Sequence, residues 1–403
     1  MAIVANTAGS FNVDTIYGEG VEKINVDKSF KPVETWGNEV YLWLFGKNTR
    51  TVDTFANFKY FAQVDEVRKF TITGVNAGTK TLTFAPSGYN IANVLQANNF
   101  IMFINRDSGT STIPAAELYV GHAIKSVSGN DVVLYDALPT NCAAGDQIKY
   151  YAHARSDASM PRDAVTWQPV SGTNSCSFLS SSIETGLIAG NEATYVDVLK
   201  MNRALAETSF WRDINGILTW NNAIANVIDG TKTVYNGKGI YYMLKTDTVS
   251  FSVPEVTSVF EYDFGNDMTI TDWQKIANRM KKYGMKEKTI FHDTWLKEKL
   301  NILLQDKVIY NDKVKVLEMD ATRIVIDGVT FTLIWDRNLD EANYKGGFGL
   351  DNYYAQGIKY SGIPAHLIRN VQPKGKASNM DEFIFACSCQ LTRGETHMRY
   401  IHD

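Results

Sequence analysis

The sequence of 403 residues has little proline, few cysteines and almost no net charge. Nine prolines are too few for a proline-rich scaffold, and a formal charge of −4 gives no cationic coat for nucleic acid. An apolar fraction of 44% with 21% charged residues excludes a largely disordered chain. No apolar run approaches the roughly 18 to 20 residues that cross a membrane, so no membrane partner is expected. The N-terminal residues likewise hold no run long enough for a signal peptide.

The four cysteines form no pair of the Cys-x-x-Cys kind that holds a structural metal. Cys142 and Cys176 stand alone, whereas a single residue separates Cys387 from Cys389. In a strand, the last two would share a face. Because free cysteine is commonly buried, all four are predicted to be reduced, buried thiols of a protein made in a reducing cytoplasm.

Motifs that carry chemistry are missing as well. The sequence has no phosphate-binding P-loop, no nucleophile elbow and no His-Glu-x-x-His helix. The glycine-rich residues 346–349 are interpreted as a flexible loop, and Asp340 and Glu341 as solvated loop charge. His292 precedes Asp293, which is explained as a helix N-cap. We therefore predict no catalytic residue, no cofactor and no metal ligand.

Aromatic residues, in contrast, are abundant: 20 Tyr, 20 Phe and 8 Trp. They favour strands with large packing side chains. Residues 1–48 are predicted to form an extended arm that leads into a short amphipathic segment, with Trp36 and Trp43 as apolar anchors. Such anchors dock either onto another molecule or onto the chain's own core, and the sequence leaves both alternatives open.

Residues from about 66 to 152 are predicted to form a small all-β unit of five or six strands. Between Thr71 and Ala152, only nine of 82 residues are charged. Short alternating runs, such as 131–135, are separated by turn residues, as in a series of hairpins.

Residues 153–190 are polar and are predicted to form a two-stranded excursion that carries Trp167 and Phe178. A long helix is then predicted over 192–214, with Gly216 ending it. Its signals are an N-cap residue followed by apolar residues at spacings of three and four: Asn191, Tyr195, Val198, Met201 and Leu205.

Residues 271–316 are highly charged, with 17 charged residues in 46, of which 11 are Lys or Arg. A capping box from Thr271 to Gln274 is predicted to begin a helix. Three basic residues lie along one side of it, and we interpret them as a solvated face rather than a nucleic-acid contact: Lys275, Arg279 and Lys282.

Two hairpins are predicted further along the chain. The first turns at Asp327-Gly328, a strong hairpin signal. The second would pair residues 383–387 with 398–401 by turning at Arg393-Gly394. Helix, strand, helix and hairpin in this order predict a compact α/β domain.

The order of these parts resembles the major capsid proteins of tailed phages, which have the Hong Kong 97-type fold, in the branch with a β insertion in the extended loop. No single short motif is diagnostic. The matching segments are 165–168 with 174–188 as the returning limb of the extended loop, 191–211 as the spine helix, and 268–276 with 289–291 and the Asp327-Gly328 hairpin as the axial domain.

The resemblance implies an α+β fold of four parts. These are an N-terminal arm (1–48), an extended loop (49–190) carrying an inserted β domain (about 66–152), a peripheral domain (191–264 and 358–403) with the spine helix (192–214), and an axial α/β domain (265–357).

It further implies a capsid protein, made in the host bacterial cytoplasm, whose hexamers and pentamers form the icosahedral shell of a virion around packaged double-stranded DNA. Implied partners are its own copies, a portal and decoration proteins. Since the chain starts at the arm, the resemblance implies either a separate scaffolding protein or assembly without one. Proximity to the DNA would be non-specific. The predicted assembly-interface residues are Trp36, Trp43, Trp167 and Phe178. The alternatives are another phage structural protein, such as a tail tube or virion component, or a hydrolytic enzyme with an accessory β module.

If this interpretation is right, residues 1–48 and 153–190 become ordered only on assembly, because arms of this kind bury their anchors against neighbouring subunits. Hydrogen exchange measured on the free subunit should then show fast exchange in both stretches and slow exchange after assembly. Protection already present in the free subunit would contradict the expectation.

Overall fold

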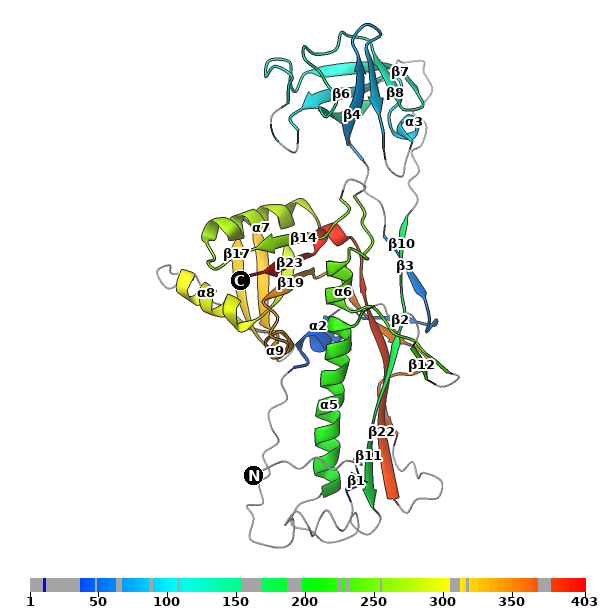
Figure 1. The fold of residues 1–403 in the computed structure, drawn as a ribbon, viewed down its shortest axis with the longest axis vertical. Coiled ribbons are helices and arrows are strands. Elements are labelled where there is room, and N and C mark those ends of the chain that lie inside the picture. The colour runs from blue at the N-terminus through cyan, green and yellow to red at the C-terminus, as the bar shows by residue number, and fades with distance from the viewer. Residues whose placement is uncertain are drawn as a thin grey trace. The chain divides into compact units, whose positions relative to one another are not determined.

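The computed structural model of the chain contains two compact units (Figure 1). The larger unit comprises Met1–Ala62, Ser171–Phe251 and Thr257–Asp403, and the smaller unit comprises Gln63–Val170 and Ser252–Val256. The structure describes residues 10–11, 37–47, 49–62, 67–86, 90–106, 109, 111–153, 169–186, 198–222, 227–229, 232–253, 256–304, 312–316, 319–368 and 378–403.

Sheet 1 of the larger unit has the strand order β1-β11-β22-β20-β2, with β21 also paired to β22. Its strands are β1 (Ser10–Phe11), β11 (Ser177–Gly186), β22 (Ser378–Leu391), β20 (Ala355–Tyr360), β2 (Thr49–Val52) and β21 (His366–Ile368). β11 and β22 are antiparallel over the whole of β11. Alternate residues of β22 enter one apolar core: Phe383, Phe385, Cys387, Cys389 and Leu391. The prediction that Cys387 and Cys389 share a buried face is confirmed.

Helix α5 (Val198–Trp220) runs along β11 and β22 (Figure 1). Three residues spaced four apart are buried in the same core: Phe210, Ile214 and Leu218. The predicted end at Gly216 is wrong, since the helix continues for another turn. A glycine inside a helix costs only about 1 kcal/mol relative to alanine, and burial of Leu218 in that turn outweighs this cost. The predicted N-cap Asn191 lies outside the described residues.

Sheet 2 of the larger unit has the strand order β14-β23-β19-β15-β18-β17-β16. Its strands are β14 (Phe260–Asp263), β23 (Met398–Ile401), β19 (Gly346–Asp351), β15 (Glu287–His292), β18 (Val329–Trp335), β17 (Met319–Ile326) and β16 (Asp312–Val316).

Both faces of the central strands of sheet 2 are covered. Ile290 and Leu333 pack in a core with helices α7 (Ile270–Lys282) and α8 (Thr294–Leu304). Phe291 and Ile334, the next residues along each strand, pack instead in the core that contains α5 and β22. Because both faces are buried there, two apolar residues follow each other at the centre of each strand instead of alternating with polar ones.

The prediction of a flexible loop at residues 346–349 is wrong. These residues begin β19, which lies between β15 and β23 and is buried along its whole length. A Cβ on Gly347 would lie 2.2 Å from the carbonyl oxygen of Phe291 and 2.6 Å from Cε1 of Tyr400. Glycine at this position therefore lets neighbouring strands approach closely.

The predicted hairpin at the end of the chain is also wrong. β22 belongs to sheet 1, whereas β23 belongs to sheet 2, where it lies between β14 and β19. A short 3-10 turn, η1 (Gly394–Thr396), connects them, and Arg393 before it has a φ of 57°. The chain thus crosses from one sheet to the other at Arg393-Gly394. The segment 358–403, which was assigned to one domain, contributes strands to both sheets.

The Asp327-Gly328 hairpin is confirmed. Ile326 pairs with Val329, so the loop has two residues. The φ angles of 48° at Asp327 and 78° at Gly328 are those of a type I′ turn, whose twist matches that of the flanking strands.

The two helices on sheet 2 begin at capping residues. In α7 the capping box is formed by Thr269 and Asp272, two residues before the predicted pair Thr271 and Gln274. In α8 the prediction is confirmed, because Oδ1 of Asp293 accepts a hydrogen bond from the backbone N–H of Leu296 at 3.3 Å.

The smaller unit contains a closed barrel with the strand order β4-β5-β8-β7-β6-β9. Its strands are β4 (Lys69–Asn76), β5 (Thr81–Phe84), β6 (Asn99–Ile104), β7 (Gly121–Ser128), β8 (Asp131–Leu134) and β9 (Gln147–His153), with the short helix α3 (Ile91–Val94) between β5 and β6. Its first and last strands are neighbours, with Lys69 opposite Lys149. Closure leaves the barrel without a free sheet edge.

A buried carboxylate fixes the loops of the barrel. Asp146 is fully buried and accepts hydrogen bonds from Ser111 Oγ at 2.7 Å, Ala143 N at 2.9 Å, Arg106 Nε at 2.9 Å and Thr112 Oγ1 at 3.0 Å. Burial acts to raise the pKa of Asp146, but these hydrogen bonds outweigh it and leave the pKa below its usual value.

The remaining described elements of the larger unit are short. They are helices α2 (Glu39–Lys47), α6 (Ile240–Lys245) and α9 (Arg337–Glu341), the paired strands β3 (Phe58–Ala62) and β10 (Val170–Asn174), and the paired strands β12 (Val227–Asp229) and β13 (Lys232–Val234).

The close approach at Gly347 can be tested with Gly347→Ala. The added methyl group collides with the backbone of β15, so we expect a loss of about 3 kcal/mol in the free energy of unfolding, measured with urea. The matched control is Gly216→Ala in α5, where a Cβ has no heavy atom within 4 Å. This control should stabilise the protein by about 0.5–1 kcal/mol; equal effects of the two substitutions would contradict the packing argument.

Candidate functional site

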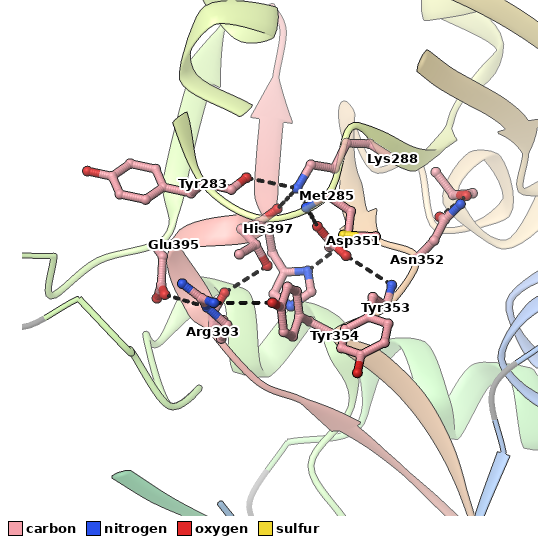
Figure 2. Close-up of polar contacts among 12 residues, drawn as sticks. Tyr283, Met285, Lys288, Asp351, Asn352, Tyr353, Tyr354, Arg393, Glu395 and His397 are labelled. Atoms are coloured by element: carbon pink, nitrogen blue, oxygen red, sulfur yellow. Dashed lines mark hydrogen bonds and ion pairs between the residues drawn. The ribbon is translucent and has the colours of Figure 1, made fainter. Parts of the chain in front are cut away.

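A buried ion pair lies where the chain crosses from sheet 1 to sheet 2 (Figure 2). Lys288 on β15 places Nζ 2.6 Å from Oδ2 of Asp351, the last residue of β19, and both side chains are buried. Two carbonyl oxygens accept the other ammonium protons, that of Thr396 at 2.9 Å and that of Tyr283 at 3.3 Å. Because an ammonium has three N–H donors, all of them are used within the chain.

The Asp351 carboxylate also receives backbone donors. Its Oδ2 accepts a hydrogen bond from Met285 N at 2.8 Å, and its Oδ1 accepts one from Tyr353 N at 2.9 Å. Gly284, with a φ of 75°, lies against this carboxylate, since a Cβ there would be 2.4 Å from Asp351 Oδ2. Glycine therefore allows the turn between α7 and β15 to wrap around the carboxylate.

His397 joins the network as a neutral imidazole. The backbone N–H of Asp351 donates to Nδ1 of His397 at 3.2 Å, and Nε2 lies 3.0 Å from the carbonyl oxygen of Thr392. Because a backbone N–H can only donate, Nδ1 must be the acceptor and Nε2 must carry the proton. Burial lowers the pKa of His397 to about 4; the charge of Asp351 opposes this shift and that of Lys288 adds to it.

A second charged pair borders the crossover. Arg393 Nε donates to Oε1 of the buried Glu395 at 3.2 Å, and Arg393 Nη1 donates to the hydroxyl of Tyr354 at 3.1 Å. The guanidinium also lies over the Tyr354 ring, 5.1 Å from its centroid. The crossover residues 392–397 are thus attached to the turn after β19 (Figure 2).

This arrangement is suited to fixing two sheets together. Burial lowers the pKa of Lys288, while the adjacent Asp351 raises it. With its three protons donated within the chain, the Lys288 ammonium has no donor left for a substrate. The network connects strands β15 and β19 to the crossover segment 392–397, and we assign it a structural role.

Two exposed apolar side chains stand on the backbone that this network holds. Met285 is 52% exposed and Tyr353 is 63% exposed. The backbone N–H of each donates to Asp351, so both side chains project from a fixed main chain. Exposed apolar side chains on a rigid backbone are suited to protein contacts, because little entropy is lost on binding.

The predicted interface residues have different environments. Trp43 is 2% exposed and packs edge-on against Phe291, 5.6 Å between ring centroids, so it belongs to the chain's own core. This is the second of the two alternatives that the sequence left open for the arm, and Trp43 is not available to a neighbour. Phe178 on β11 is 47% exposed. Trp36 and Trp167 lie outside the described residues.

The interpretation of Asp340 as solvated charge is wrong. Its carboxylate accepts hydrogen bonds from Thr294 N at 2.9 Å, Thr294 Oγ1 at 2.6 Å and Trp335 Nε1 at 2.6 Å, and so connects the start of α8 to the end of β18. Glu341, in contrast, pairs with the partly exposed Arg337 at 2.6 Å within α9.

Sequence reasoning also missed a hydrogen-bonded pair at the end of the chain. His402 Nε2 lies 2.5 Å from Oδ2 of the helix cap Asp293, and its ring stacks on Trp295 with 4.1 Å between centroids. Asp293 was predicted only as a cap. A separation of 109 residues leaves no local signal for the pair.

Two absences concern only the described parts of the chain. None of the helices there is long and apolar enough to cross a membrane. Among the same residues, no group of three or more His, Cys, Asp or Glu side chains is placed to hold a metal ion.

Neither a protein-family model nor a curated protein sequence matches the chain. Solved structures do resemble it in fold. The capsid of a native GTA particle is 8% identical with a TM-score of 0.45, covering 100% of this chain and 99% of that chain. A chain from Mycobacterium phage Bobi is 7% identical with a TM-score of 0.46, covering 97% and 98%. A chain from Microbacterium phage Oxtober96 is 10% identical with a TM-score of 0.45, covering 96% and 98%. The described helices and strands of this chain give it an α+β fold.

The structural role of the ion pair can be tested with Lys288→Met. This substitution leaves the Asp351 carboxylate buried without its ammonium partner, so we expect a loss of about 3–5 kcal/mol in the free energy of unfolding. The control is Lys299→Met, which removes a pair with Asp267, whose side chain is 87% exposed. The control should cost less than about 1 kcal/mol, and a comparable loss in both variants would contradict the role of burial.

The neutral state of His397 predicts a pH dependence. Its pKa is lower in the folded state than the ordinary value of 6.5, so the unfolded chain binds the proton first and stability is lost as the pH falls from about 6.5 to about 4. This residue alone should contribute a loss of about 3 kcal/mol. Urea unfolding of the wild type and of His397→Gln at pH 7 and pH 4 measures it, because glutamine can accept and donate the same two hydrogen bonds without titrating. Parallel stability curves for the two proteins would contradict this assignment.

Proposed function

We propose that this chain is a major capsid protein, a subunit that associates with its own copies into the hexamers and pentamers of an icosahedral shell around the double-stranded DNA of a tailed phage. The observation that carries the proposal is the order of parts along the chain. A barrel is inserted between the paired strands β3 and β10, the long helix α5 follows, and sheet 2 with α7 and α8 comes next. The last strands then complete both sheets.

This order supports the domain assignment as part of the proposal. The arm is residues 1–48, the extended loop 49–190 with the β domain at about 66–152, the peripheral domain 191–264 and 358–403, and the axial domain 265–357. In this assignment α5 is the spine helix, and β23 connects the peripheral segment back to the axial sheet.

The surface of the larger unit supports contacts on more than one side. A subunit of a closed wall must bind several neighbours, with interfaces of roughly 800 Å² per partner. Exposed apolar side chains lie on four different elements: Phe178 on β11 (47% exposed), Leu205 on α5 (48%), Ile302 on α8 (65%) and Val325 on β17 (64%). Spread over several elements, they fit many moderate interfaces better than one ligand site.

Further partners follow from the proposal. Within a virion, the subunit would meet a portal, a separate scaffolding protein during assembly, and decoration proteins on the outside. The barrel would either contact neighbouring subunits or decorate the outer surface. Phe178, Trp36 and Trp167 remain proposed interface residues. A tail-tube subunit would need a β-sandwich core, whereas here α5, sheet 1 and sheet 2 share one mixed core.

Negative-stain electron microscopy of the purified protein tests the proposal directly. We expect closed shells, or rings of five and six subunits. The matched variant Phe178→Ser should reduce assembly while leaving the urea unfolding of the free subunit nearly unchanged, because the side chain is exposed in the subunit. A protein that stays monomeric at high concentration, and that binds a small molecule in a cleft, would contradict the proposal.

A further inference from the structure

The turn between α7 and β15 carries an exposed basic surface. Lys281, Lys282 and Lys286 are all exposed. Lys281 and Lys282 complement the helix dipole at the end of α7, but Lys286 lies beyond the helix and gains nothing from it. The main chain of this turn is fixed, because Met285 N donates to the buried Asp351 carboxylate at 2.8 Å. Three ammonium groups are therefore presented on a rigid backbone.

Two apolar side chains belong to the same surface. Met285 and Tyr353 are both exposed, and the backbone N–H of each donates to the Asp351 carboxylate (Figure 2). The ring of Tyr353 also packs edge-on against that of Tyr354, with 5.1 Å between centroids. An apolar centre with a charged rim is typical of a protein-binding surface. We call this the basic turn surface, and its members are Lys281, Lys282, Met285, Lys286 and Tyr353.

Strands β11 and β22 form a surface of the opposite charge. Neither strand contains a lysine or an arginine. Of their three acids, Asp381 pairs with Arg203 on α5, whose Nε donates to Oδ2 at 2.5 Å. Glu184 and Glu382 lie on the other face of the strands, which therefore carries carboxylates and no cation of its own.

The packing and the register of the two strands define this face. Leu179 and Ile183 pack into the core that contains α5, so the even-numbered residues of β11 point away from that core. Paired residues of antiparallel strands share a face, and Ser182 is paired with Glu382. We call this the outer strand face, and its members are Phe178, Ser180, Ser182, Glu184, Glu382 and Ile384.

The two surfaces are complementary in charge, and both contain apolar side chains. Both are exposed in the single subunit, as Met285 and Phe178 show, so neither covers the other within one chain. A different acidic protein could bind the basic turn surface but would leave the outer strand face without a partner, whereas a second copy supplies both. We propose that the basic turn surface of one copy binds the outer strand face of the next copy. This inference rests on the proposed self-association and names two surfaces that carry it.

A contact of this kind is heterologous, because different surfaces of the two copies meet. Each copy still offers one surface of each kind to a further copy, and the series closes into a ring where the rotation permits. Attraction between lysines and carboxylates at the rim speeds association and is screened by salt. Association of the copies should therefore weaken as the salt concentration rises.

Two charge-changed variants test the contact by sedimentation velocity over a range of protein concentrations. The turn variant combines Lys281→Glu with Lys286→Glu, and the strand variant combines Ser180→Lys with Glu382→Lys. Each alone should associate at least about tenfold more weakly than the wild type, because like charges then face each other. An equal mixture of the two should associate nearly as the wild type does, since the acidic turn of one variant matches the basic strand face of the other and the unchanged surfaces also match.

The matched control combines Lys125→Glu with Lys149→Glu, which are exposed lysines of the barrel. It changes the net charge as much as the turn variant does and should associate as the wild type. All variants should unfold at the same urea concentration as the wild type, because the altered side chains lie at the surface.

Cross-linking of the wild type maps the same contact without any substitution, and so tests it even if the strand variant fails to fold. A carbodiimide joins an amine to a carboxylate in contact with it. Mixing isotope-labelled with unlabelled copies distinguishes links between copies from links within one copy. We expect links from the lysines of residues 281–286 in one copy to Glu382 in another.

Three results would overturn the contact while leaving the proposed function intact. One is equal weakening of association in the turn variant and the barrel control. Another is an assembled wild type in which every link from residues 281–286 stays within one copy. The third is a turn variant that associates normally but loses binding of double-stranded DNA, since the turn would then be a nucleic-acid contact. A wild type that stays monomeric at every concentration would instead overturn the proposed function and this contact together.

Discussion

The covering of sheet 2 on both faces is the constraint from which most of the larger unit follows. A central strand with no solvent-exposed face can carry a polar side chain only if that side chain is hydrogen-bonded inside the protein. β15 therefore carries apolar side chains to both cores, and its one ammonium, Lys288, donates all three protons to the chain. The close packing of β19 against β15 requires glycine at position 347, because a side chain there would collide with the backbone of β15.

The crossover segment, residues 392–397, connects sheet 1 to sheet 2 both covalently and through hydrogen bonds. β22 ends sheet 1, and residues 392–397 lead into β23 of sheet 2. His397 and Arg393 attach this segment to the end of β19 and the turn after it, and the carbonyl of Thr396 attaches it to Lys288 on β15. Relative movement of the sheets would have to break buried, charge-assisted hydrogen bonds, which are costly to leave unmade.

Local signals in the sequence identified local structure well. The two-residue turn Asp327-Gly328 and the cap Asp293 were found because each acts on residues two or three positions away. Long-range structure was not readable in the same way. Residues 346–349 were interpreted as a flexible loop because glycine-rich segments occur both in loops and in strands whose neighbours approach closely, and the sequence does not distinguish the two. Arg393-Gly394 looked like a hairpin turn, since the sequence does not show that its two flanking strands enter different sheets.

The polar site was the part least accessible to sequence reasoning. The pair Lys288–Asp351 joins residues 63 apart, and Asp293–His402 joins residues 109 apart. The one available signal was a lysine directly before the strand residues Thr289-Ile290-Phe291, because burying it demands a partner. Trp43 shows a related limit of the sequence. Its large apolar side chain predicted a buried contact, but only its packing against Phe291 shows that this contact lies within its own chain.

The pairing of the first and last strands of the barrel has a consequence for engineering and evolution. Because β4 and β9 are neighbours, the polypeptide enters and leaves this module at adjacent positions. A segment with adjoining ends can be exchanged for another of equal span with little strain on its host. Recombination could thus acquire or replace such a cassette in one step, and a designer could graft a foreign reporter or antigen at the same junction.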